Sequence, residues 1–133
     1  MIAQFSINTL KEKEFIDITQ RINDLICGIS DGVVTIFIPH TTAGITINEN
    51  ADSNVQFDLL WKFNDLSPKH PEYRHSEGNS DAHLLSTLVG SSVQVIIKDG
   101  QLMLGVWQSI YFCEFDGPRN RKVFLQIIGD IND

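Results

Sequence analysis

The chain has few cysteines and no apolar run long enough to cross a membrane. Cys27 and Cys113 are its two cysteines, and their wide separation without CxxC spacing argues against a disulfide framework or a thiolate zinc site. The longest apolar run, residues 33–39, is far shorter than the roughly 20 residues of a membrane span. Residues 1–10 lack the basic flank and long apolar stretch of a signal peptide. We therefore expect a cytoplasmic protein with no membrane partner and two ordinary, partly buried thiols.

Basic residues are also scarce. Seventeen Asp and Glu residues face ten Lys and Arg residues, giving a formal net charge of -7. Such a field repels the phosphate backbone of nucleic acids, so we expect no nucleic-acid partner. A length of 133 residues with 42% hydrophobic content predicts one domain, residues 1–133, built around one core.

The N-terminal part of the chain predicts two strands and a helix. Residues 4–10 and 14–17 favour extended structure, and the lysine-rich turn between them makes a hairpin plausible. After Asp17, isoleucine and leucine recur at helical spacing as far as Ile29, and Asp17 with Gln20 resembles a capping box. We expect a first helix there.

A buried strand comes next. Residues 30–32 read as a turn that stops the helix, and residues 33–38 form a nearly continuous β-branched run typical of a strand buried on both faces. This strand brings His40 to its end. Beyond a glycine, apolar and polar residues alternate over 45–48, which points Asn48 away from the apolar face.

A second helix is predicted over residues 53–66, capped by Asp52 or Ser53. Phe57 and Trp61 lie well outside its apolar stripe, so we expect a second surface to cover the helix. The apolar stripe consists of Val55, Leu59, Phe63 and Leu66.

The rest of the chain predicts a loop over 67–79, a helix over 80–89 with His83 in its first turn, and then strands. These strands, expected as an antiparallel meander, are residues 92–97, 101–106, 107–115 and 121–128. Roughly eight strands and three helices indicate an α+β fold, a β-sandwich of mostly antiparallel strands with about three flanking helices.

Polar residues gather where the buried strand ends. His40, Thr41 and Thr42 follow the strand, and Asn48, Glu49 and Asp52 come shortly after. The threonines and asparagine are equally typical of turns and helix caps, whereas His40 together with Glu49 favours a functional site.

A second polar segment, residues 73–83, opens into the third helix. His75, Glu77, Asn79, Asp81 and His83 supply imidazoles, donors and acceptors. The helix dipole disfavours a protonated His83, which suits a neutral metal ligand or hydrogen-bond acceptor. Taken alone, the spacing of these histidines matches no self-sufficient zinc motif.

A third candidate is the basic turn at residues 116–122. Arg119 lies among three basic residues in an acidic protein, so an anion can dock there, although a solvated hairpin tip explains the same residues.

Taken together, these segments resemble the YjbQ-type family in order and spacing. The C-terminal segments agree with that family too, including the stretch that holds Trp107. The matching segments are residues 40–44, 48–52, 75–83, 91–93, 100, 105–108 and 114–119.

The resemblance implies a small sandwich fold, a homotrimer, and a histidine-containing site near subunit boundaries that binds a metal or an oxyanion. It also implies a secondary, low-level thiamine-phosphate synthase activity, which joins a pyrimidine diphosphate to a thiazole phosphate and leaves the physiological substrate open. On this basis we expect three groups of site residues. They are His40, His75 and His83 as ligands of a divalent metal such as Zn or Mg; Glu49, Asp52, Glu77 and Asp81 as catalytic carboxylates; and Thr41, Thr42, Asn48, Asn79, Trp107 and Arg119 as ligand-binding residues, with Arg119 on a phosphate.

Two other classes of protein fit the same residues. One is a metal-assisted hydrolase of a small phosphorylated metabolite, because three imidazoles can hold a metal that activates water. The other is a trimer that binds a phosphorylated metabolite without turnover. Only the crowding of ionisable residues into two short segments argues against this class.

Overall fold

The computed structural model describes residues 1–131, which form eight strands and three helices. The larger sheet contains, in spatial order, β1 (Ile2–Asn8), β8 (Asn120–Ile131), β3 (Ile29–Phe37), β5 (Ser92–Lys98) and β6 (Gln101–Leu102). The smaller sheet contains β2 (Glu14–Asp17), β7 (Gln108–Glu114) and β4 (Ala43–Glu49). The helices are α1 (Thr19–Leu25), α2 (Asn54–Leu66) and α3 (Ser80–Val89).

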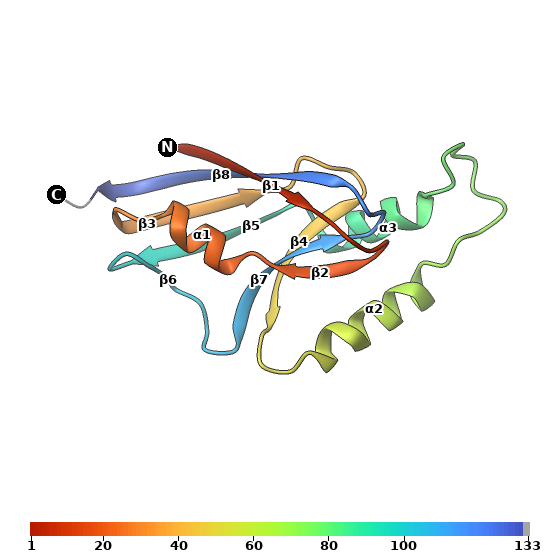
Figure 1. Cartoon of the computed structure of the whole chain (residues 1–133), viewed down its shortest axis with the longest axis horizontal. Coiled ribbons are helices and arrows are strands. Elements are labelled where there is room, and N and C mark those ends of the chain that lie inside the picture. Colours follow the sequence, from red (N-terminus) through yellow and green to blue (C-terminus); the bar gives the residue numbers. More distant parts are fainter. Residues whose placement is uncertain (132–133) are drawn as a thin grey trace.

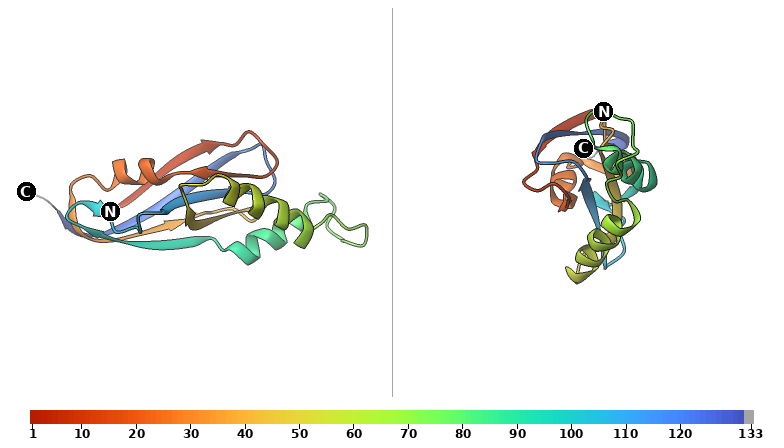
Figure 2. Two further views of the ribbon diagram at one scale, coloured as in Figure 1. Left: turned by 90° about the horizontal axis from the view of Figure 1, so that it is seen from below. Right: turned by 90° about the vertical axis from the view of Figure 1, so that its right-hand side faces the viewer.

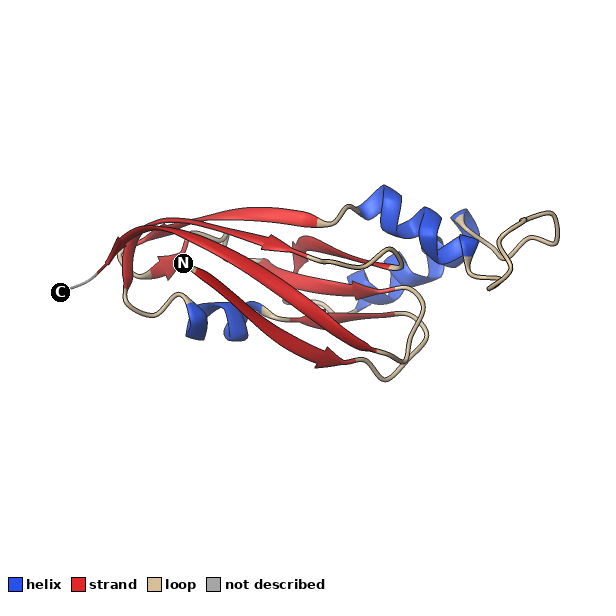
Figure 3. Cartoon of the chain, turned by 90° about the horizontal axis from the view of Figure 1, so that it is seen from above, coloured by secondary structure: helices blue, strands red, loops and turns tan. Residues whose placement is uncertain are grey.

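The predicted fold class is confirmed. All paired strands in both sheets are antiparallel, and the main core takes side chains from both sheets and from α1. In Figure 1, α2 and α3 lie together toward one end of the molecule and α1 lies toward the other, as Figure 3 also shows. The loop between α2 and α3 forms the tip beyond them (Figure 2). Residues 132 and 133, which the predicted domain includes, lie outside the described residues.

Strand β7 is covered on both faces, and its side chains alternate between two clusters. Ile110 and Phe112 belong to the main core, whereas Cys113 packs in a second cluster with Leu85 of α3 and with Phe115. Burial raises the pKa of the Cys113 thiol far above its ordinary value. The expectation of two partly buried thiols is wrong, because Cys113 is fully buried and Cys27 is exposed.

The expected N-terminal hairpin is wrong. β1 pairs with β8 and β2 pairs with β7, so the two strands enter different sheets. The turn between them is closed by a side chain instead of a strand ladder, because Glu14 Oε2 accepts the N–H groups of Leu10 and Lys11 at 2.7 and 2.9 Å.

The first helix is shorter than expected, and the turn predicted at residues 30–32 lies inside β3. The pairing of β3 with β8 shifts between Ile29 and Gly32, and a side chain at Gly32 would collide with the backbone of Ile128. That glycine therefore serves close strand approach, not a turn. The expected capping box is also wrong, since Gln20 donates to Asp24 while Asp17 accepts the N–H of Thr19.

The expected C-terminal meander is wrong as well. β5 and β8 both pair with β3, β7 belongs to the other sheet, and the strand predicted over 101–106 shrinks to the two residues of β6. Apart from β5 and β6, which pair with each other, consecutive strands of the described chain alternate between the two sheets.

Helices α2 and α3 agree closely with the expected spans. Phe63 of α2 packs against Phe115, with ring centroids 5.8 Å apart. Phe57 and Trp61 are 68% and 64% exposed, which fits their position outside the apolar stripe, although Leu66 of that stripe is exposed too. None of the helices within residues 1–131 combines the length and apolar character needed to cross a membrane.

A buried ion pair joins the two sheets at the end nearest α3. Glu114 is completely buried at the end of β7, and Arg121, 4% exposed near the start of β8, donates to both of its carboxylate oxygens. Thr9, which follows β1, donates to Glu114 at 2.8 Å, and Arg121 Nη2 donates to Thr42, which precedes β4, at 2.9 Å. Four chain segments meet in this network.

The network fixes the charge of Glu114. Burial by itself would raise the pKa of Glu114, but hydrogen bonds from Arg121, the N–H of Asp116 and Thr9 outweigh it, so the pKa lies below its ordinary value. Glu114 therefore remains a carboxylate at neutral pH.

We predict that Glu114→Gln lowers the free energy of unfolding by about 3–5 kcal/mol at pH 7, because it leaves the Arg121 charge buried without a partner. Since the folded pKa is lowered, the stabilisation is present above the unfolded pKa of about 4.3 and is lost as pH falls through the folded value. Urea unfolding measures both effects.

The matched control is Asp65→Asn, which removes an exposed carboxylate paired with Lys62 at 2.9 Å and should cost less than about 1 kcal/mol. Equal losses in the two variants would contradict the role assigned to the buried pair.

Candidate functional site

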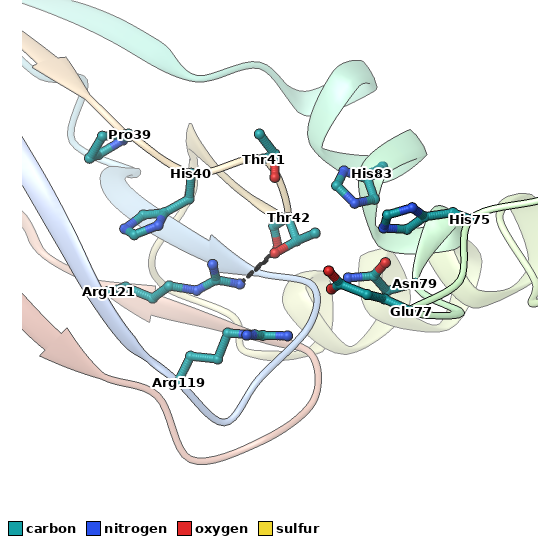
Figure 4. A pocket seen from close by; sticks show the side chains of 10 residues that line it. All are labelled: Pro39, His40, Thr41, Thr42, His75, Glu77, Asn79, His83, Arg119 and Arg121. Atoms are coloured by element: carbon teal, nitrogen blue, oxygen red, sulfur yellow. Dashed lines mark hydrogen bonds between the residues drawn. The ribbon is translucent and has the colours of Figure 1, made fainter.

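A polar pocket of about 460 Å³ lies beside the buried ion pair (Figure 4). We call it the anion pocket. Its lining residues are Pro39, His40, Thr41, Thr42, His75, Glu77, Asn79, His83, Arg119 and Arg121.

Three separate parts of the chain build this pocket: residues 39–42, 75–83 and 119–121. The connection from β3 to β4 supplies residues 39–42, the loop before α3 supplies His75 and Glu77, and the start of α3 supplies Asn79 and His83. Arg119 and Arg121 come from the turn into β8 and from β8 itself. His83 lies in α3 and Arg121 lies in β8, whereas the other lining residues lie in the connections between elements.

The three predicted imidazoles line this one pocket. The rings of His75 and His83 lie edge to face with centroids 5.3 Å apart, and His40 lies across the pocket from them (Figure 4). His70 does not line the pocket and lies instead beside Tyr73, with ring centroids 5.7 Å apart.

His40 is held in one tautomer. Its Nε2 accepts the backbone N–H of Lys122 at 2.8 Å, so in the neutral ring the proton sits on Nδ1. Partial burial, and next the positive charge of Arg121, lower the pKa of His40 below its ordinary value. At neutral pH His40 is therefore uncharged and can donate from Nδ1.

This hydrogen bond bears on the predicted metal. A metal ligated through Nδ1 would require a proton on Nε2, which could then no longer accept from Lys122. Among residues 1–131, no three His, Cys, Asp or Glu side chains are grouped closely enough to hold a metal ion. As the side chains stand, the three-histidine set does not fit a metal centre, and the divalent metal stays a prediction.

Asp116 positions two groups at the rim of the anion pocket. Its Oδ2 accepts from Asn79 Nδ2 at 2.8 Å and from Arg119 Nη2 at 2.9 Å. Burial would raise the pKa of Asp116, but the hydrogen bonds from Asn79 and Arg119 outweigh it and lower the pKa, so Asp116 is ionised at neutral pH. Within the described chain, the buried Oδ1 of Asn79 has no hydrogen-bond partner.

The pocket concentrates hydrogen-bond donors, among them two guanidinium groups that are each paired with a carboxylate, in a chain with a formal net charge of -7. Arg119 and Arg121 supply two guanidinium groups, and His40 supplies an N–H. Among residues 1–131, Glu77 is the one carboxylate in the lining, and the two carboxylates that pair with the arginines, Glu114 and Asp116, are not part of it. Such an arrangement suits an oxyanion such as phosphate.

Several predicted site residues lie elsewhere. Asn48, Glu49, Asp52 and Trp107 belong to the far end of the smaller sheet, and the seven residues of β4 separate that end from the pocket by roughly 20 Å. Glu49 Oε2 accepts the N–H of Ala51, and Asp52 and Asn48 likewise accept nearby backbone N–H groups. These side chains close local turns.

Asp81 also lies outside the pocket lining. It is buried in the first turn of α3, with Oδ2 3.6 Å from Lys13 Nζ. Of the four predicted catalytic carboxylates, the structure therefore brings only Glu77 to the predicted histidines, within residues 1–131.

Arg121 belongs to the basic turn predicted as an anion-docking candidate, but it was not among the expected ligand-binding residues. Arg121 occupies the same side of β8 as the buried Val123 and Leu125. Glu114 likewise shares a face with Ile110 and Phe112. A charged residue at an inward position of each strand is the signal that could have predicted this buried pair.

The fold and the pocket define a class: a small α+β protein of two antiparallel sheets with a pocket lined by histidines and arginines at one end. The family model "UPF0047 protein YjbQ-like" matches residues 3–130, and the chain belongs to that family.

Relatives share nearly the whole chain. UPF0047 protein MJ1081 of Methanocaldococcus jannaschii is 51% identical over 132 residues, covering 98% of this chain and 96% of that protein. UPF0047 protein YugU of Bacillus subtilis is 48% identical over 132 residues, covering 97% of this chain and 100% of that protein.

Solved structures agree with the fold. A YjbQ/UPF0047 family protein from Clostridium acetobutylicum superposes with a TM-score of 0.91 at 52% identity, covering 95% of this chain and 99% of that one. A YbjQ-like protein from Sulfolobus solfataricus, described as of unknown function, gives 0.91 at 30% identity, covering 98% and 97%. Family membership therefore fixes the fold and leaves the activity to be argued from the site.

We predict that His40→Gln reduces the acid sensitivity of the fold. Because the folded pKa of His40 is lowered, the unfolded state takes up its proton first, near pH ~6.5, and the native protein loses stability from there down to the folded pKa. Glutamine keeps an acceptor for Lys122 but does not titrate.

Urea unfolding at pH 7 and pH 5, with a chelator present, should show a smaller loss in His40→Gln than in the unmodified chain. The same loss in both proteins would show that His40 does not contribute.

Proposed function

We propose that the anion pocket binds the phosphate or diphosphate group of a small phosphorylated molecule and supports a weak thiamine-phosphate synthase-type reaction. The observation that carries this proposal is the convergence of Arg119, Arg121 and three imidazoles on one pocket of an acidic chain. Their hydrogen bonds to ionised oxygens are charge-assisted, which makes them stronger than neutral ones.

The proposed chemistry needs stabilisation of a leaving group more than a strong base. The thiazole nitrogen attacks the pyrimidine methylene carbon, a C–N bond forms, and the C–O bond to the diphosphate breaks with its electron pair leaving on pyrophosphate. Arg119 and Arg121 would neutralise this charge, and the Nδ1–H of His40 would donate to it. Glu77 would orient the second substrate.

The hydrolase alternative is less well supported. It requires a metal on the three imidazoles, and the hydrogen bond from Lys122 to His40 opposes that arrangement. Binding without turnover remains the second candidate, and the scarcity of carboxylates in the pocket favours it.

An assay that follows two products separately distinguishes the synthase, the hydrolase and the binding protein. Purified protein is incubated with the two thiamine precursors, with and without a divalent cation, and the release of phosphate and of pyrophosphate is followed separately. We expect slow formation of thiamine phosphate with equimolar pyrophosphate. Phosphate release alone would support a hydrolase, and no product above a heat-inactivated control would support a binding protein.

We predict that Arg119→Gln weakens pyrophosphate binding about tenfold to a hundredfold, the range expected on losing one charge-assisted contact. Isothermal titration calorimetry measures the change. The matched control is Arg74→Gln in the exposed loop before α3, which lies outside the pocket lining and should leave the affinity unchanged. Equal losses in both variants would indicate a diffuse charge effect and contradict the assigned site.

We also propose a homotrimer. The exposed Phe57 and Trp61 on α2 support a partner surface, because large exposed rings on one helix face are typical of protein contacts. Light scattering should give a trimer mass, and Trp61→Glu should lower the mass. A monomer at all concentrations would contradict the proposal, and a stable dimer would keep the contact surface but reject the trimer.

A further inference from the structure

A second pocket of about 420 Å³ adjoins the anion pocket. The two pockets share His40, Thr41 and His83, and the second adds Ser86, Thr87 and Ser91 at the other end of α3 and just beyond it. We call it the hydroxyl pocket. A ligand that passes between His40 and His83, both labelled in Figure 4, would therefore enter both pockets.

The hydroxyl groups of α3 offer acceptors only. Ser86 Oγ donates its proton to the carbonyl of Ala43 at 2.7 Å, and Thr87 Oγ1 donates to the carbonyl of His83 at 2.8 Å. A hydroxyl has one proton and two lone pairs, so a group bonded in this way can present only lone pairs to a ligand. A ligand atom that bonds to either oxygen must carry an N–H or an O–H.

The hydroxyl pocket also differs from the anion pocket in charge. Apart from the two shared histidines, none of its lining residues is ionisable, whereas the anion pocket contains Arg119 and Arg121. A charged group in the hydroxyl pocket would have no oppositely charged side chain beside it. The pocket is therefore better suited to an uncharged polar group.

We propose that the hydroxyl pocket binds the uncharged, hydrogen-bond-donating part of the phosphorylated molecule whose phosphate occupies the anion pocket; this inference rests on the proposed function. The ligand is then a phosphate ester whose remaining part carries N–H or O–H groups. Ser86 and Thr87 accept from those groups. His40 and His83 flank the junction, which places the bond between the phosphate and the rest of the molecule beside them.

Two matched esters test this inference. Ribose 5-phosphate and tetrahydrofurfuryl phosphate share a five-membered ring and a phosphate, and they differ in ring hydroxyls. Calorimetry should give about tenfold tighter binding of ribose 5-phosphate, the gain expected from two added hydrogen bonds. Inorganic phosphate serves as the probe of the anion pocket alone.

Two substitutions at one position assign the preference to the pocket. Thr87→Val keeps the shape of the exposed side chain and removes the acceptor oxygen, so it should cut the preference to about threefold, whereas Thr87→Ser should retain it. Arg119→Gln should weaken both esters and leave their ratio unchanged. Thermal melting confirms that each variant is folded.

The outcomes separate this inference from the proposed function. Binding of phosphate and of both esters with equal affinity would overturn the hydroxyl pocket and leave the anion pocket in place. A preference for ribose 5-phosphate that survives Thr87→Val would also overturn it. No binding of phosphate or of either ester would overturn the proposed function and this inference together.

Discussion

The buried pair of Glu114 and Arg121 connects the fold to the pocket. Its partners Thr9 and Thr42 come from the ends of other strands, so the pair holds both sheets in register where the pocket forms. An isolated buried ion pair is a poor stabiliser compared with hydrocarbon of similar volume. Arg121 also lines the anion pocket, so the buried pair holds a guanidinium donor in a fixed position at the site.

Other pocket residues are also held in place by hydrogen bonds. Asp116 accepts hydrogen bonds from Arg119 and Asn79, and the backbone N–H of Lys122 fixes the orientation of the His40 ring. The carboxylates of Glu114 and Asp116 thus stay outside the pocket lining, while the donors line the cavity. A chain with an acidic surface can in this way keep a local site for anions, and donors fixed in advance cost little reorganisation when a ligand binds.

Short-range patterns predicted much of this structure. The period of apolar residues and the capping residues predicted α2 and α3 close to their observed ends. Strand pairing was not predictable in the same way, because β1 and β2 adjoin in the chain yet enter different sheets. The turn predicted at residues 30–32 failed because Gly32 serves contact with β8, a partner nearly a hundred residues away in the chain.

The site residues were likewise predictable where they cluster in sequence and not where they depend on strand pairing. His40, His75, His83, Asn79 and Arg119 were chosen from local clusters, and the fold brings them to one pocket. Glu49 and Asp52 were grouped with His40 by closeness in sequence, but an extended strand carries its two ends apart. Arg121 required knowledge of which side of β8 faces inward, and the hydroxyl pocket required the positions of the hydrogen bonds of α3.

The most direct test of the central claim is a crystal structure of the protein with tungstate, a heavy analogue of phosphate that is located by anomalous scattering. The account predicts a peak in the anion pocket, with oxygens about 3 Å from the guanidinium of Arg119 and the Nδ1 of His40. A peak only elsewhere on the surface, or a pocket that stays empty at saturating tungstate, would contradict the claim that this site binds oxyanions.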